Sequence, residues 1–360
     1  MKLTPIVIAL TLAAAATATA TACDEPKPST TGPVMSPMPR SGQSPSPLTG
    51  DESTTATGLR LLTDTGGLID VDSGALQRVS ADGWLPAVRR KPILVKLNRH
   101  SDMSRPLQAS TANEPKLPGN PSVTTIDMYA GTSLAAGIDG RIWVHEYRSK
   151  SICTLRRLGE RERPTACETH LLAETPYGLW AMLGANWDRA VLIDPVTLEE
   201  KLTYPRVAVI DEHRVVSWGP DADDPVVVHD MRTKQSRRTL WPDFHGWPDP
   251  SPAVASPDGS RIAFRFGNPS NSPQIQDVWI LELQDLHWVR APGMPTFATL
   301  KSGTIAWAPD GTLVMLSVFY DKLTPEFGGQ TPRKLVATWR PGNQRWELRT
   351  VPETGQFVVW

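Results

Sequence analysis

One hairpin-like motif occurs twice in this 360-residue chain, about fifty residues apart. The stretches SPAVASPDGSRIAF and SGTIAWAPDGTLVML begin at positions 251 and 302, and each holds Pro-Asp-Gly between two apolar runs. In such a turn, Pro fixes φ at the second position, Asp bonds to the nearby backbone and Gly accepts a positive φ. The motif therefore predicts two antiparallel β-hairpins, which turn at Asp258-Gly259 and at Asp310-Gly311.

Strand pairs with polar turns follow these hairpins and recur elsewhere, so that four strands form a repeating unit. Apolar residues alternate or come in short runs bounded by Gly, Pro, Asp and Asn, which favours strands over helices. A repeat of four strands every 36 to 55 residues or so is typical of a β-propeller. Clear units cover 170–204, 206–241, 252–291 and 303–350, a further unit is expected at 123–158, and 84–109 is an abbreviated unit or only a connection.

The two ends of the repeat region complement each other. The first unit, 58–80, supplies only three strands, whereas GQFVVW at 355–360 supplies one more. If the last strand joins the first unit, no sheet edge is left open there. The sequence therefore predicts an all-β chain with a single β-propeller over 56–360, of seven blades, or of six if 84–109 is a connection.

Two segments resemble a known repeat type. ASPDGSRIAF and WAPDGTLVML, each followed by a strand of the DVWILEL type, resemble the TolB-like (PD40) class of WD40-like propeller repeats. VLIDPVTLEEKLTYP is similar to the strand pairs of YVTN-type propellers. The resemblance implies the repeat fold. The Gly-His and Trp-Asp marks of WD40 repeats and the α/β domain of TolB are not found, so it does not imply TolB's partners.

The first residues have the pattern of a targeting segment. Lys2 is followed by an apolar stretch and by small residues that end at Cys23, which predicts a signal peptide over 1–22. The tetrapeptide Ala20-Thr21-Ala22-Cys23 resembles a bacterial lipobox, with Ala20 where Leu is preferred, and this implies lipidation of Cys23. Ordinary cleavage and secretion is the alternative.

Residues 23–55 are dominated by Pro, Ser, Thr and Gly without apolar periodicity, which predicts a disordered tether behind the anchor. We therefore expect a protein anchored by lipid on the extracytoplasmic face of a bacterial cell membrane. The chain has three cysteines. If Cys23 carries lipid, Cys153 and Cys167 remain as a pair that can form a disulfide in an oxidising compartment.

No motif for catalysis is evident in the sequence. The net charge of −1 and the pI near 6.7 give no support for nucleic-acid binding. The chain lacks a G-x-S-x-G elbow, and its seven histidines show neither H-x-H nor H-x-x-x-H spacing. We therefore predict no cofactor, no metal and no enzymatic activity. A lactonase-like propeller enzyme with a metal is the third hypothesis.

Long loops are predicted to gather on one face. They cover 218–225, 242–251, 267–276 and 319–332, and each joins the second and third strands of a blade or crosses between blades. Loops longer than a turn requires are often binding sites. We predict a monomer that binds a protein partner of the cell envelope through this face, or alternatively a glycan or small ligand. The predicted partner-binding residues are Trp218, Asp221, Trp241, Phe244, His245, Trp247, Asp249, Phe319 and Tyr320, with WPDFHGWPDP at 241–250 as the best single segment. For some of the aromatic residues, Trp218 and Phe319 especially, the alternative is a core position at a strand end.

Overall fold

A computed structural model gives the fold of the chain. The chain divides into two units, Met1–Pro37 and Met38–Trp360, and all residues described below belong to the second. The predictions for the signal peptide, for Cys23 and for most of the tether lie outside the described residues. The described residues are 44–79, 83–85, 93–99, 109–110, 123–128, 133–149, 152–167, 169–184, 189–221, 223–267, 275–299, 304–320 and 332–359.

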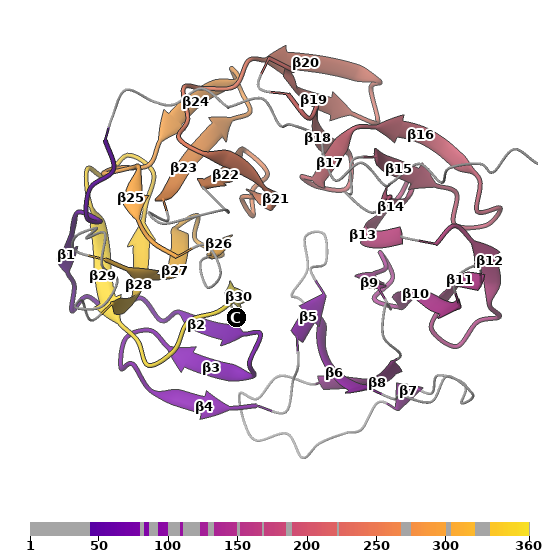
Figure 1. The fold of residues 1–360 in the computed structure, drawn as a ribbon, viewed down its shortest axis with the longest axis horizontal. Helices are drawn as coiled ribbons and strands as arrows, with labels where there is room; N and C mark the ends of the chain where they lie inside the picture. Colours follow the sequence, from indigo (N-terminus) through magenta and orange to yellow (C-terminus); the bar gives the residue numbers. More distant parts are fainter. Residues whose placement is uncertain are drawn as a thin grey trace, which may run out of the picture. The chain divides into compact units, whose positions relative to one another are not determined.

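The described residues form β-strands, turns and loops, and the strands assemble into seven sheets (Figure 1). This part of the chain has no helix with the length and hydropathy needed to cross a bilayer. The strands are β1 (Gly50–Glu52), β2 (Arg60–Thr63), β3 (Gly67–Asp70), β4 (Leu76–Arg78), β5 (Gly83–Leu85), β6 (Ile93–Arg99), β7 (Ala109–Ser110), β8 (Val123–Met128), β9 (Ser133–Ala136), β10 (Ile142–Ser149), β11 (Ile152–Arg157), β12 (Arg163–Thr165), β13 (Thr169–Thr175), β14 (Gly178–Leu183), β15 (Arg189–Ile193), β16 (Glu200–Tyr204), β17 (Arg206–Val209), β18 (Arg214–Trp218), β19 (Val226–Asp230), β20 (Gln235–Thr239), β21 (Trp247–Ala255), β22 (Arg261–Gly267), β23 (Ile275–Glu282), β24 (His287–Arg290), β25 (Thr296–Phe297), β26 (Thr304–Trp307), β27 (Leu313–Phe319), β28 (Arg333–Trp339), β29 (Trp346–Thr350) and β30 (Phe357–Val359).

Successive sheets contact one another through the strand at one edge of each sheet. β30 contacts β26, and contacts continue from β26 to β21, β17, β13, β9 and β5. Within most sheets the strands then follow in chain order, as in β13-β14-β15-β16 and β17-β18-β19-β20. This all-β arrangement is that of a β-propeller, as the four-strand repeat predicts. The blade number and the closure stay predictions.

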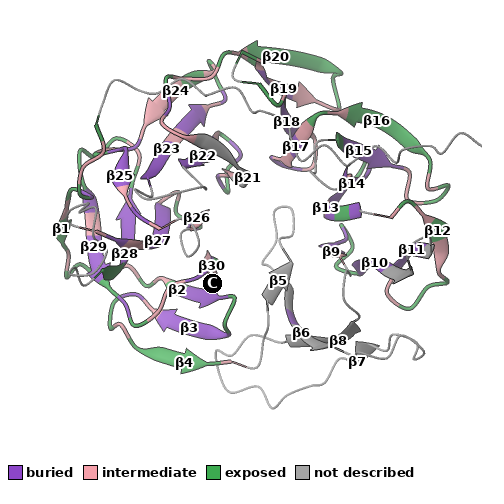
Figure 2. Cartoon of the chain, viewed as in Figure 1, coloured by how far each residue is buried: buried purple, intermediate pink, exposed green. Residues whose placement is uncertain are grey.

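The middle strands of several sheets are buried on both sides, because neighbouring sheets pack on them (Figure 2). Along β22, Ile262, Phe264 and Phe266 pack against side chains of the β17–β20 sheet. The intervening Ala263 belongs to the core shared with the β26–β29 sheet. Alternating side chains of one strand thus fill two different inter-sheet cores. The outer strands β4, β16 and β20 are largely exposed.

The Pro-Asp-Gly turns form as predicted. Gly259 and Gly311 have φ of 67° and 82°, and their N–H groups donate to Ser256 O and Ala308 O. Hydrogen bonds from the Ser256 and Ser260 hydroxyls and from the Ser260 N–H lower the pKa of Asp258 to about 2. The aspartate therefore stays ionised and holds the turn.

Two predicted units are corrected by the sheet pairing. β8, the expected first strand of 123–158, pairs in parallel with β6, and the fourth strand of the β9–β12 sheet is instead β12. The stretch 84–109 contributes to a separate sheet with order β5-β6-β8-β7. The antiparallel repeat of the other units concealed this assignment, because a parallel partner is not adjacent in the chain.

The N- and C-terminal segments both pack on sheets. β30 pairs with β2, with Leu62 opposite Val358. The end of the predicted tether departs from the prediction, because β1 pairs in parallel with β29 and Leu48 is buried in a core. We call residues 44–55 the strap. Its apolar Leu48 and its backbone hydrogen bonds offset the entropy lost on ordering.

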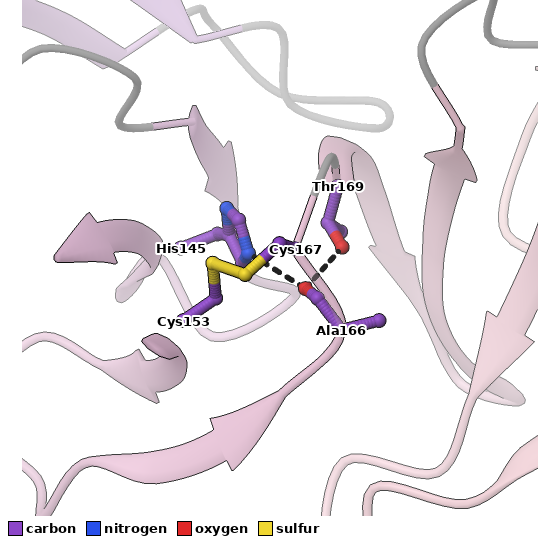
Figure 3. The surroundings of a disulfide bond; sticks show 5 residues. All are labelled: His145, Cys153, Ala166, Cys167 and Thr169. Atoms are coloured by element: carbon purple, nitrogen blue, oxygen red, sulfur yellow. Dashed lines mark hydrogen bonds between the residues drawn. A yellow bond between two sulfur atoms is a disulfide. The ribbon is translucent and has the colours of Figure 1, made fainter. Parts of the chain in front are cut away.

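The structure joins Cys153 and Cys167 by a disulfide with 5.2 Å between the Cα atoms. The bond ties β11 to the segment after β12. The Ala166 carbonyl beside it accepts a hydrogen bond from Thr169 Oγ1, and His145 Nε2 lies 3.0 Å from the same oxygen. Figure 3 shows both side chains directed at this carbonyl. The disulfide therefore fixes the end of one sheet where the chain passes to β13.

Replacement of both cysteines by Ala is expected to lower the free energy of unfolding by about 2–4 kcal/mol, since the crosslink closes a short loop in the unfolded chain. The two cysteines are 14 residues apart in the sequence. Urea unfolding with and without dithiothreitol measures the effect. The native chain should lose stability under reduction and the double variant should not. Equal curves for both proteins would contradict the prediction.

Stability is also expected to depend on the protonation of buried His145 and half-buried His229. Burial lowers the pKa of His145 and that of His229 in the folded chain. Below about pH 6.5 the unfolded chain therefore binds more protons than the folded chain. The free energy of unfolding should thus be higher at pH 7.5 than at pH 5.5. Urea titrations at both pH values test this, and an unchanged or higher midpoint at pH 5.5 would count against it.

Candidate partner-binding loop face

The described ends of the four long loops lie close together, at the ends of β18, β20, β22 and β27. Trp241 contacts Trp218 of the first loop and Phe266 at the end of β22. The start of the 319–332 loop joins this group through β25. This strand pairs with the start of β23, and its Phe297 O accepts a hydrogen bond from Tyr320 N–H. We call this group of loop ends the loop face.

An aromatic cluster lies beneath the loop face. Half-buried Trp241 is at its centre, with ring centroids 5.4–6.4 Å from those of five neighbours. Phe244 stacks on Phe266 with centroids 4.1 Å apart and an interplanar angle of 14°. Such a cluster combines a large apolar area with specific ring geometry. The neighbours of Trp241 are Trp218, Phe244, Phe264, Phe266 and Trp288.

Burial corrects three of the predicted partner-binding residues. Phe244 is completely buried, and Trp218 and Phe319 are each 3% exposed. These side chains fill inter-sheet cores because each lies beside the apolar face of a neighbouring strand. They are therefore core residues and cannot contact a partner.

The other predicted residues are placed differently. Asp221 is exposed, whereas Trp241, His245 and Tyr320 are half-buried. The backbone of Trp247 pairs with Gly267 at the start of β21, and Asp249 belongs to the same strand. The side chains of Trp247 and Asp249 lie outside the described part of the structure. Exposed Asp243, between Trp241 and Phe244, also faces solvent on this loop.

A buried carboxylate holds the 241–246 loop in place. Asp277, completely buried at the start of β23, accepts hydrogen bonds from the His245 backbone N–H at 2.9 Å and from Trp279 Nε1 at 3.0 Å. Arg290 donates to both of its oxygens, from Nε at 2.9 Å and from Nη2 at 2.8 Å. The Arg290 guanidinium also lies 5.2 Å from the centroid of the Trp279 ring. Four donors therefore satisfy one buried charge and fix the loop backbone.

A close backbone approach fixes the end of the same loop. Gly246 has a φ of 97°, and a Cβ at this position would lie 2.6 Å from Gly267 O. Only glycine accommodates both the conformation and the contact. The 241–246 loop is thus held by Asp277, by Gly246 and by the buried Phe244 ring.

Sequence reasoning missed Asp277, Trp279 and Arg290. The available signal was an aspartate within the apolar strand IQDVWILEL, followed 13 residues later by an arginine. A buried carboxylate in such a strand requires a partner of opposite charge. Among the described residues, no group of three His, Cys, Asp or Glu side chains is placed to hold a metal ion.

Comparisons with known proteins add fold neighbours. No protein-family model and no curated protein matches the sequence. Among solved structures, the chain is similar to the hydrazine synthase of Kuenenia stuttgartiensis, with 13% identity, a TM-score of 0.43, and coverage of 61% of this chain and 65% of that one. The β-propeller domain of the Trilobed protease from Pyrococcus furiosus matches with 10% identity, a TM-score of 0.32 and the same coverage. The chain spans less than two thirds of each of these.

A fungal alcohol oxidase of the AA5 family, solved in complex with copper, is also similar. It matches with 14% identity and a TM-score of 0.45, over 89% of this chain and 69% of that one. Similar structures also include tricorn protease and an acylaminoacyl peptidase, so several of these fold neighbours are enzymes. This corrects the prediction that the chain is not an enzyme, and we withdraw it. What those enzymes act on remains a property of those proteins.

Proposed function

We propose that this propeller binds a protein partner through the loop face, while its N-terminal segment holds it at the extracytoplasmic side of a bacterial membrane. One observation carries the binding proposal: the 241–246 loop is fixed at His245 by Asp277 and at Phe244 by the aromatic cluster. A loop that is ordered before binding loses little conformational entropy on binding.

The charge of the loop face favours a basic partner surface. Asp221, Asp223 and Asp243 are exposed there, whereas the charge of Asp277 is neutralised by Arg290. Exposed carboxylates on a fixed loop attract cations and orient a complementary surface. The half-buried Trp241 and His245 add apolar area beside them. This combination is typical of the polar rim around a small aromatic contact.

A photo-crosslinking experiment tests the loop face directly. A benzoylphenylalanine at position 243 is compared in cells with one at Pro257, an exposed residue of a tight turn between β21 and β22. The proposal expects one discrete crosslinked protein from position 243 and none from position 257. The yield of this crosslinked protein should also be lower in the Asp221→Asn variant. Identical products from both positions, or none from either, would overturn the proposal.

The membrane anchor rests on the sequence pattern around Cys23 and has its own test. Cys23→Ser is expected to abolish incorporation of labelled palmitate and to move the protein from the membrane pellet to the soluble fraction. Cys153→Ala provides the control, because it removes a different cysteine and should leave the fractionation unchanged. Unaltered labelling of Cys23→Ser would show that Cys23 is not the lipid site.

A further inference from the structure

The outer edge of the β17–β20 sheet carries a concentration of positive charge. Arg232, Lys234, Arg237 and Arg238 lie within seven residues, and the segment 231–240 contains no acidic residue. All four side chains belong to exposed residues. β20 is the last strand of its sheet, and no described strand pairs with its outer side. We call β20 and these four cations the basic edge.

Cations on two other outer strands are neutralised, whereas Arg163 on β12 donates to the carbonyls of Val196 and Pro195. Arg78 on β4 lies 2.6 Å from Glu353, and Lys201 on β16 lies 2.6 Å from Asp194. On the basic edge, Arg237 donates to the carbonyls of Leu283 and Gln284 in the next sheet.

The remaining three cations of the basic edge differ in their ion pairing from Arg78 and Lys201. Within the part of the chain that the structure describes, Arg232, Lys234 and Arg238 form no ion pair. The chain as a whole is nearly neutral, so this charge is a local feature. A local excess of cations attracts anionic groups over a Debye length of about 8–10 Å.

The chain itself shows what an outer strand of this kind can bind. β1, with the sequence Gly-Asp-Glu, adds in parallel to the outer edge of β29, with Asp51 opposite Glu347. Asp51 forms an ion pair with Arg345, with 3.1 Å between Asp51 Oδ1 and Arg345 Nη2. An acidic extended segment thus lies on an arginine-bearing blade edge within this molecule. Main-chain pairing supplies affinity and the side chains supply selectivity in such strand addition.

We propose that the basic edge binds an acidic, extended peptide segment of a partner protein as an added strand. β20 offers unpaired backbone groups along its outer side. Successive residues of a strand point to opposite sides, so Arg237 and Arg238 lie on either side of the added strand. The basic edge runs along the outer side of β20, whose end belongs to the loop face, and this proposal does not rest on the proposed function.

Fluorescence anisotropy with a synthetic nonapeptide tests the proposal on the full chain. In the labelled peptide threonine alternates with glutamate, which combines strand propensity with negative charge. We expect saturable binding that weakens as NaCl is raised from 50 to 500 mM. The triple variant Arg232→Gln, Lys234→Gln and Arg238→Gln should bind about tenfold more weakly, the sum of three exposed charge contacts. A matched triple variant of exposed arginines elsewhere, Arg60→Gln, Arg161→Gln and Arg189→Gln, should bind like the native chain.

Two further probes separate strand addition from charge attraction alone. A peptide with glutamine in place of glutamate, and one with alternate backbone amides methylated, should each bind at least tenfold more weakly. Equal binding of the methylated peptide would overturn strand addition, and equal loss in both triple variants would overturn the location. Vesicles of phosphatidylglycerol provide the last probe. Binding of vesicles but not of peptide, sensitive to the basic-edge variant, would overturn the proposal in favour of a membrane surface.

Discussion

Asp277→Ala is expected to lower the free energy of unfolding by about 3–5 kcal/mol, because it removes one partner of a buried ion pair. The change removes the Asp277 carboxylate from the Arg290 guanidinium, whose side chain is only 18% exposed. It also leaves the His245 N–H and Trp279 Nε1 without their acceptor. Equilibrium urea unfolding, followed by tryptophan fluorescence and by circular dichroism, measures the loss.

A second ion pair in the same sheet provides the matched control for Asp277→Ala. Arg261 Nε lies 2.8 Å from Glu282 Oε1, but these side chains are 32% and 27% exposed. Water therefore screens the pair, and Glu282→Gln should cost less than about 1 kcal/mol. Asp277→Asn, which keeps the shape and part of the hydrogen bonding, should fall between the two variants. Equal losses for Asp277→Ala and Glu282→Gln would show that Asp277 does not organise the loop.

The local parts of the fold were predictable because short-range chemistry determines them. Pro-Asp-Gly sets the turns at Asp258 and Asp310 without help from distant residues. The place of β8 was not predictable in this way. β8 pairs in parallel with β6, so its sheet does not follow the antiparallel strand order of the other units. The strap was also missed, because a Pro-rich segment can be ordered by one buried residue, Leu48, and a few backbone bonds.

The candidate site was harder to predict than the fold. Sequence reasoning singled out the segment 241–250, which contains the 241–246 loop, but assigned its aromatic residues to a binding surface. Whether Phe244 faces solvent or a core depends on Phe266, which comes from another strand and stacks on it. The loop is fixed by Asp277, whose role depends on Arg290 of the next strand. Both facts are tertiary, and no local pattern of residues encodes them.

Phe244→Ala is expected to destabilise the protein by about 3–5 kcal/mol, the cost of a large-to-small change in a packed core. The ring is completely buried, stacks on Phe266 and meets Trp241 edge to face. Its removal leaves a cavity beneath the loop face, and the loop would lose one of its three fixed points. Denaturant unfolding of the variant gives the free energy directly.

Two neighbouring substitutions separate this packing role from a role in binding. Phe244→Leu keeps much of the apolar volume and should cost about 1.5 kcal/mol or less, so the folded variant can be tested for the crosslink at position 243. Asp243→Asn changes an exposed residue and should leave stability within about 0.5 kcal/mol. If Phe244→Ala were as stable as the native chain and yet lost its partner, Phe244 would be a contact residue, and the buried position of its ring would be wrong. If it is unstable while Phe244→Leu still binds, the ring supports the loop from below, and the exposed carboxylates above it make the contact.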